Sequence, residues 1–218
     1  MKVWKILGEI RSKDKKARRE EILKTILKNR GIKTEDQIKE FLQTKISLPA
    51  LQSLVSKKQL KLACRRIKKA IEREEQIVIF GDYDCDGICG TAILWQTLTT
   101  LGAKVHPFIP NRSDGYGLSQ KGIERILPFK PSLVITVDNG INAVNSVAYL
   151  SSLGIDVVIT DHHLLSGPLP SAFAILHSLD LSGAAVAWIL AQSLTINHQP
   201  STITLILLLW QQLLTLFP

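Results

Sequence analysis

Short apolar runs alternate with longer amphipathic stretches over most of the chain. The runs are rich in Val and Ile and lie at 77–80, 105–109, 133–137, 157–160 and 173–176. Apolar residues at helical spacing fill the intervals at about 88–101, 119–127, 141–153 and 182–195. Strands that alternate with helices are joined by right-handed crossovers and form a mainly parallel sheet. The pattern therefore predicts an α/β fold, with helices on both faces of such a sheet.

The first 75 residues have a helical period instead. A charged segment at about 12–29 carries its apolar residues on one side, and Asn29-Arg30-Gly31 ends it. Two capping boxes, Thr34-x-x-Gln37 and Ser56-x-x-Gln59, begin further helices. The helix after Ser56 is amphipathic, and its polar face holds a set of cations: Lys57, Lys58, Lys61, Arg65, Arg66, Lys68 and Lys69.

This change of period divides the chain into three predicted parts. Residues 1–75 form a basic helical N-terminal region, 76–195 an α/β domain, and 196–218 an atypical apolar tail. A membrane span is not expected, because the apolar stretch at 203–217 is short and is interrupted by Gln211-Gln212. The start of the chain is charged rather than apolar, and the three cysteines are too few for a disulfide scaffold. We therefore predict a cytoplasmic protein.

Charge is distributed unevenly along the chain. The net charge is +8, but residues 1–75 hold 22 of the 27 Lys and Arg and only 10 of the 19 Asp and Glu. The remaining residues are therefore acidic overall. A basic region beside an acidic one favours binding of an anionic polymer next to a metal site. The alternative is a solvated, lysine-rich helical face with no binding role.

Carboxylates and imidazoles follow three of the predicted strands at the point where each ends. Gly81-Asp82-Tyr83-Asp84-Cys85-Asp86-Gly87 follows the first strand, Asp138 the third, and Asp161-His162-His163 the fourth. In a parallel sheet these ends meet at one edge, where ligands bind. Mixed oxygen and nitrogen ligands favour Mn²⁺, Mg²⁺ or Zn²⁺. Two such ions would clamp a phosphodiester and activate water.

Simpler interpretations exist for parts of this pattern. An EF-hand loop also begins with three alternating aspartates, but its twelfth position must be Glu and is Ile93 here. Asp138 alone is equally typical of a helix cap. Cys85 and Cys89 lack partners at the spacing of a zinc site, so we expect them to be small core residues.

The aspartate segment 81–87, Val137-Asp138-Asn139-Gly140 and Thr160-Asp161-His162-His163 resemble, in this order, the first three motifs of the DHH phosphoesterase superfamily. Within it, 109–118 resembles the phosphate- and DNA-contacting loop of the RecJ family of single-strand-specific 5′→3′ DNA exonucleases. Residues 29–32 with 41–42 are similar to the N-terminal segment of that family, and 181–187 to its helix start after the third motif. The resemblance covers about 20–195.

The resemblance implies a set of site residues. The implied metal ligands are Asp82, Asp84, Asp86, Asp138 and His162, with Asp138 between two Mn²⁺ or Mg²⁺ ions. The implied catalytic residues are Asp161, which orients a histidine, His162, and His163, which faces the scissile phosphate. The implied contacts to DNA or phosphate are Asn111, Arg112, Tyr116 and Gly183. The implied partner is single-stranded DNA, in repair or recombination.

The resemblance breaks after the third motif. The fourth motif of the family ends in an Asp, and no acidic residue follows Asp180 here. We expect a C-terminally truncated form with a weakened second metal. With suitable codons, Ile206 to Thr215 is the neighbouring reading frame of Asp-Leu-Ile-Ala-Leu-Ala-Thr-Ile-Ala-Asp, so a frameshift is one explanation of the tail. A genuine apolar helix is the other.

Three functions remain open from the sequence. The first is a metal-dependent 5′→3′ exonuclease on single-stranded DNA. The second is a DHH phosphatase for short oligonucleotides or nucleotides, which the long basic region disfavours. The third is a catalytically impaired fragment of the same fold that binds single-stranded DNA.

Overall fold

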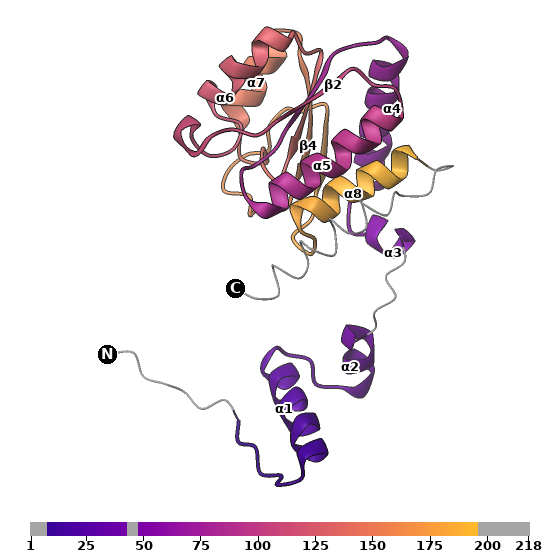
Figure 1. Ribbon diagram of the computed structural model, residues 1–218, viewed down its shortest axis with the longest axis vertical. Coiled ribbons are helices and arrows are strands. Elements are labelled where there is room, and N and C mark those ends of the chain that lie inside the picture. The colour runs from indigo at the N-terminus through magenta and orange to yellow at the C-terminus, as the bar shows by residue number, and fades with distance from the viewer. Residues whose placement is uncertain (1–7, 43–47, 196–218) are drawn as a thin grey trace. The chain divides into compact units, whose positions relative to one another are not determined.

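The computed structural model describes residues 8–42 and 48–195 (Figure 1). Contacts divide the chain into two units, one up to Ser47 and one from Leu48 onward. The predicted apolar tail at 196–218 lies outside the described residues. Among the described residues, no helix is long and apolar enough to cross a membrane.

The first unit holds two helices, α1 (Lys15–Asn29) and α2 (Glu35–Leu42). Asp14 begins α1, because its carboxylate accepts from the backbone nitrogens of Lys16 and Ala17. The predicted capping box before α2 is confirmed, since Thr34 and Gln37 each accept from the backbone nitrogen of the other. On α1 only Leu27 is fully buried in this unit.

The second unit is built on a five-stranded parallel sheet with the order β2-β1-β3-β4-β5. The strands are β1 (Ile77–Phe80), β2 (Val105–Phe108), β3 (Leu133–Val137), β4 (Asp156–Asp161) and β5 (Ala174–His177). All five predicted strands are confirmed, to within one residue at most ends. The central strands β1 and β3 are buried at every position, which explains their continuous apolar runs.

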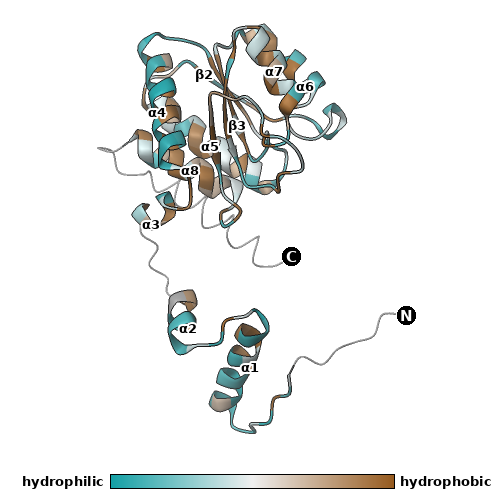
Figure 2. Ribbon diagram, turned by 180° about the vertical axis from the view of Figure 1, so that it is seen from behind, coloured by the Kyte–Doolittle hydropathy of each residue, from teal (hydrophilic) through white to brown (hydrophobic). Residues whose placement is uncertain are grey.

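Helices cover both faces of the sheet, as predicted (Figure 1). The helices of this unit are α3 (Leu48–Gln52), α4 (Lys57–Glu72), α5 (Cys85–Thr100), α6 (Gln120–Ile126), α7 (Val144–Ser152) and α8 (Gly183–Leu194). Short 3₁₀ turns lie at Arg112–Asp114 and Leu127–Phe129. In Figure 2 the strands are coloured as hydrophobic and most of α4 as hydrophilic.

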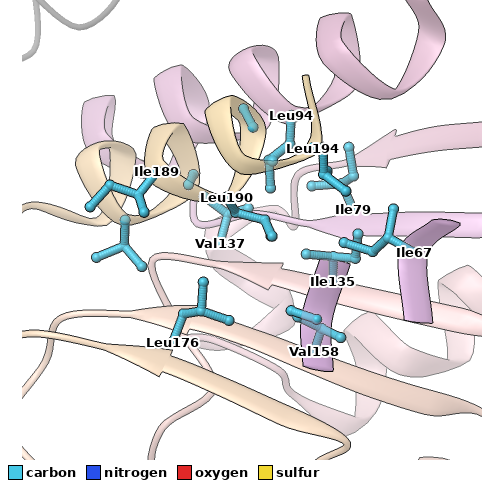
Figure 3. Close-up of a cluster of buried hydrophobic side chains, with 14 of the residues drawn as sticks. Ile67, Ile79, Leu94, Ile135, Val137, Val158, Leu176, Ile189, Leu190 and Leu194 are labelled. Carbon is cyan, nitrogen blue, oxygen red and sulfur yellow. The ribbon is translucent and has the colours of Figure 1, made fainter. Parts of the chain in front are cut away.

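Each face of the sheet has its own apolar core. On one face, side chains of α4, α5 and α8 pack on the strands, as Figure 3 shows for Ile67, Leu94 and Leu190. On the other face, α6 and α7 pack around Phe80 and Ile159. The α5–α8 pair makes the most extensive helix–helix contact. The two cores fix the strand ends that carry the polar residues of the site.

Helix α4 binds the sheet through a buried cation, which corrects one expectation. The sequence predicts Arg66 on the solvated face of α4, but this residue is only 6% exposed. Its guanidinium pairs with Glu75 at 2.7 Å and with Asp156 at 2.5 Å, and donates to the carbonyl of Ser132. Helical periodicity could not place it, because its partners lie in later segments. The other six cations of that face are not buried.

These contacts place α4 in the same unit as the sheet, although the sequence pattern put it in a separate N-terminal region. A compact unit is not the same as a region that folds alone, so the predicted boundaries at 75/76 and 195/196 stay predictions. Cytoplasmic location likewise stays a prediction.

Candidate metal centre

Three loops meet at the carboxyl edge of the sheet, because β1, β3 and β4 are neighbours. Two groups of ligand atoms form there, and within each group all atoms lie within 4.8 Å of one another. One group is Asp82, Asp84 and Asp138, and the other is Asp138, His162 and His163. Asp138 therefore belongs to both groups, which is the position of a carboxylate shared between two ions.

Asp138 has the environment expected of a ligand rather than of a helix cap. It is 1% exposed, and its φ of 63° lies in the left-handed region that costs most residues free energy. Its Oδ1 lies 3.1 Å from Nε2 of His162 but accepts no well-aligned hydrogen bond from the described part of the chain. A buried oxygen without a donor is costly unless a cation binds it.

The protonation of this edge reflects the crowding of its carboxylates. The pKa of Asp138 is raised to about 7, mainly by burial; the contact with His162 lowers it, and the nearby charges of Asp86 and Asp84 add to the increase. Burial also raises the pKa of Asp82. The pKa of His162 is raised, mainly by its polar contact with Asp138. A bound divalent cation would remove the cost of ionising these carboxylates, so the donor set fits a metal.

Asp86 stands apart from both groups. It lies in the first turn of α5, and its two oxygens accept from the backbone nitrogens of Gly183 at 2.7 Å and Ala184 at 2.6 Å. It therefore caps α8, at the positive end of that helix dipole. Nε2 of His162 is 3.7 Å from its nearer oxygen. The structure thus gives Asp86 a positioning contact between α5 and α8, and its role as a ligand stays a prediction.

Asp161 orients the segment that carries the two histidines. Its Oδ1 accepts from the backbone nitrogens of His162 and His163 and from Nδ1 of His163, at 2.8 Å for the last. Its Oδ2 accepts from the backbone nitrogen of Ile141. Because a carboxylate only accepts, Nδ1 of His163 donates to Asp161, so in the neutral ring Nε2 carries the lone pair. Asp161 therefore positions His163 in the structure, and its part in catalysis stays a prediction.

Tyr116 reaches the site from the loop between β2 and α6. Its hydroxyl lies 2.9 Å from Nε2 of His163, to which it donates in this tautomer. Its ring is edge-on to that of Tyr83, and the guanidinium of Arg112 lies 4.9 Å from the centre of the Tyr83 ring. Arg112 is exposed, and its cation–π contact with Tyr83 holds it beside the site. Tyr83 was not singled out from the sequence, although it lies inside the aspartate motif.

The other predicted contacts to DNA differ in where they lie. Asn111 is exposed at the start of the same loop, where its backbone nitrogen donates to Asp114. The N–H of Gly183 donates to Asp86, and the contact of this residue with phosphate stays a prediction. A Cβ at this position would lie 2.7 Å from Cβ of Asp138. The glycine therefore permits the close approach of α8 to the site.

A pocket of about 220 Å³ lies beside His163, between the Tyr116 loop and the start of α7. Its walls include Asn142 and Ser146, which the sequence did not single out, and Asn139 and Gly140 of the second motif. Asn139 is buried and donates to the carbonyls of Phe80 and Val137, which joins the ends of β1 and β3. The pocket opens the histidine side of the site to a small polar group.

This chain is similar in sequence and fold to known proteins. The pattern of the DHH family, N-terminal domain, matches residues 76–213. The single-stranded-DNA-specific exonuclease RecJ of Bacillus subtilis is 38% identical over 183 residues, a match to 79% of this chain and 23% of that protein. The protein of the same name in Escherichia coli is 31% identical over 184 residues, which cover 79% of this chain and 31% of that protein.

A solved structure supports the same relationship. The crystal structure of an exonuclease RecJ bound to manganese has a TM-score of 0.64 and 31% identity, over 76% of this chain and 44% of that chain. The present chain therefore matches less than a third of the length of each of the two curated relatives.

Proposed function

The chain belongs to the DHH family, and we propose that it is a metal-dependent phosphodiesterase that removes nucleotides from the 5′ end of single-stranded DNA. The single observation that carries this proposal is the sharing of Asp138 between two groups of ligand atoms. Phosphodiester hydrolysis with two metal ions needs such a shared carboxylate between closely spaced ions.

We propose Asp82, Asp84, Asp138 and His162 as the metal ligands, and Mn²⁺ or Mg²⁺ as the metal. Mainly oxygen ligands with one imidazole suit these ions, and the relative solved with manganese supports the choice. A bound ion of this kind supplies charge stabilisation to a phosphate and a water of lowered pKa.

Side chains of the protein would accept the proton of the attacking water and hold the phosphate. Asp161 holds His163 in the tautomer with a lone pair on Nε2, so this nitrogen can accept a proton from an attacking water. Tyr116 covers that nitrogen and would turn toward the substrate when DNA enters. Arg112, stacked on Tyr83, is the cation best placed to hold a backbone phosphate at the site.

The single strand would continue over cationic surface. The exposed cations of α4 lie in the same unit as the site. Phosphate contacts of this kind supply affinity without sequence preference. The name of the relatives supports single-stranded DNA as the substrate class. The basic surface also distinguishes this proposal from a phosphatase for nucleotides, which needs no extended cationic surface.

A nuclease assay tests the proposal. The 218-residue chain is incubated with Mn²⁺ and a 5′-phosphorylated single strand of about 20 nucleotides, and product length is followed over time. We expect stepwise release of nucleotides, loss of activity in Asp138→Asn, and unchanged activity in Asp180→Asn, which removes an exposed carboxylate outside both groups. Equal hydrolysis by Asp138→Asn would refute the proposed centre.

The same assay separates the alternatives. Hydrolysis of a dinucleotide but not of the longer strand would favour the phosphatase. Binding of the strand without hydrolysis in the presence of either metal would favour a catalytically impaired fragment.

A further inference from the structure

Two cysteine thiols meet beside the metal centre, which the spacing in the sequence did not predict. Cys85 is the first residue of α5 and Cys89 lies about one turn later. Their sulfur atoms are 3.9 Å apart. Cys85 is exposed and Cys89 is 7% exposed, so the pair has one open side. They are therefore more than isolated core residues.

The sulfurs are in thiol–thiol contact, and this separation also lets one ion bind both of them. A tetrahedral ion with metal–sulfur bonds of about 2.3 Å holds two sulfurs about 3.8 Å apart. A disulfide needs sulfurs about 2.05 Å apart and Cβ atoms about 4 Å apart. Residues one helical turn apart have Cβ atoms about 5–6 Å apart. Helix α5 would have to distort to form the bond, but not to place an ion between the thiols.

The chemistry of the pair differs from that of the neighbouring carboxylates. Thiolates select thiophilic ions, whereas the carboxylate and imidazole groups suit Mn²⁺ and Mg²⁺. The two kinds of ligand therefore select different classes of metal within one turn of the chain.

We propose that Cys85 and Cys89 form a second cation site, which binds one thiophilic divalent ion such as Zn²⁺ or Cd²⁺. The ion replaces the two thiol protons, which pass to solvent, and its remaining positions are filled by water. No oxidant is required. The site is independent of the proposed hydrolysis, because it uses neither Asp138 nor the histidines.

Titration with Cd²⁺ tests this site directly. The reduced 218-residue chain is titrated while the ultraviolet charge-transfer absorption of sulfur–cadmium bonds is recorded, since cadmium on carboxylates gives no such absorption. We expect a band that saturates at one equivalent. Its apparent affinity should fall at least tenfold in Cys85→Ser and in Cys89→Ser. Cys64→Ala is the matched control, because Cys64 is a half-buried cysteine of α4, and the band should be unchanged there.

Several outcomes would overturn the proposal. These are no band in the unaltered chain, the same band in Cys85→Ser, or a band that grows with protein concentration because cadmium bridges two chains. Cys85 is exposed, so its substitution by Ser should leave the fold intact, and this variant alone decides the test if Cys89→Ser does not fold. The absorption does not depend on nuclease activity, so the site and the proposed hydrolysis can fail separately.

Discussion

Asp138→Asn should make the metal-free protein more stable at neutral and alkaline pH, although it should abolish hydrolysis. Asp138 is 1% exposed, and burial raises its pKa to about 7. At pH 8 the folded protein must therefore hold a charge that is poorly solvated and has no well-aligned donor on Oδ1. Asparagine keeps the size of the side chain and removes the charge.

The size and sign of the effect follow from linkage. The ordinary pKa of the group is 3.8, so the difference between unfolded and folded protein is worth about 4 kcal/mol at most. Below pH about 4 both states are protonated and the penalty is absent. As pH rises from there to about 7, the folded protein binds more protons than the unfolded one and loses stability.

His162 changes stability in the same direction. Its pKa is raised by Asp138, so the stability that its protonation contributes is present at low pH and is lost as pH rises through the raised value. The substitution also removes the interaction between Asp138 and His162, so the net gain in stability is smaller than the upper limit. We expect Asn at this position to gain about 2 kcal/mol at pH 8.

Urea unfolding followed by tryptophan fluorescence measures this gain. The experiment compares the unaltered chain, Asp138→Asn and Asp180→Asn between pH 4 and pH 8.5 in the presence of a chelator. We expect the gain to appear only in Asp138→Asn and to vanish toward pH 4. Added Mn²⁺ should stabilise the unaltered chain and not Asp138→Asn. Parallel pH profiles for all three proteins would show that Asp138 ionises without cost, and the reasoning would be wrong.

Three further predictions concern the surroundings of the site. Arg66→Ala should lower the free energy of unfolding by about 3 kcal/mol because it leaves two carboxylates unpaired, whereas Arg65→Ala on the solvent-facing side should change it by less than about 0.5 kcal/mol; urea unfolding compares them. Tyr116→Phe should lower the rate constant of hydrolysis up to about tenfold by removing one hydrogen bond to His163, and an unchanged rate would exclude a positioning role. Each cation of the basic face that binds a DNA phosphate should contribute roughly 0.7 to the slope of log affinity against log salt, so its removal should make the slope shallower by that amount. The test replaces with Ala the residues Lys57, Lys58, Lys61 and Arg65, and an unchanged slope would indicate a merely solvated face.

The parts of the fold and site that the sequence predicted depend on local pattern. Continuous apolar runs identified the five strands, because a parallel sheet buries both faces of its strands. The ends of those strands then placed Asp82, Asp138 and the Asp161 segment at one edge, since neighbouring parallel strands all point the same way. The strands and the residues at their ends can therefore be predicted without contacts between distant residues.

The parts that the sequence could not predict depend on such contacts. Asp86 has the spacing of a ligand, but its hydrogen bonds reach the start of α8, 97 residues away. Arg66 has the spacing of a solvated cation, but its partner Asp156 lies 90 residues away. Helix α5 begins at Cys85, three residues before the predicted start at about 88. Asp84 caps it by accepting from the backbone nitrogen of Gly87.

Anomalous diffraction from crystals grown with Mn²⁺ tests the central claim most directly. The account predicts anomalous peaks about 2.2 Å from the carboxylate of Asp138, one toward Asp82 and Asp84 and one toward His162. Peaks elsewhere on the protein, with none at ligand distance from Asp138, would contradict it.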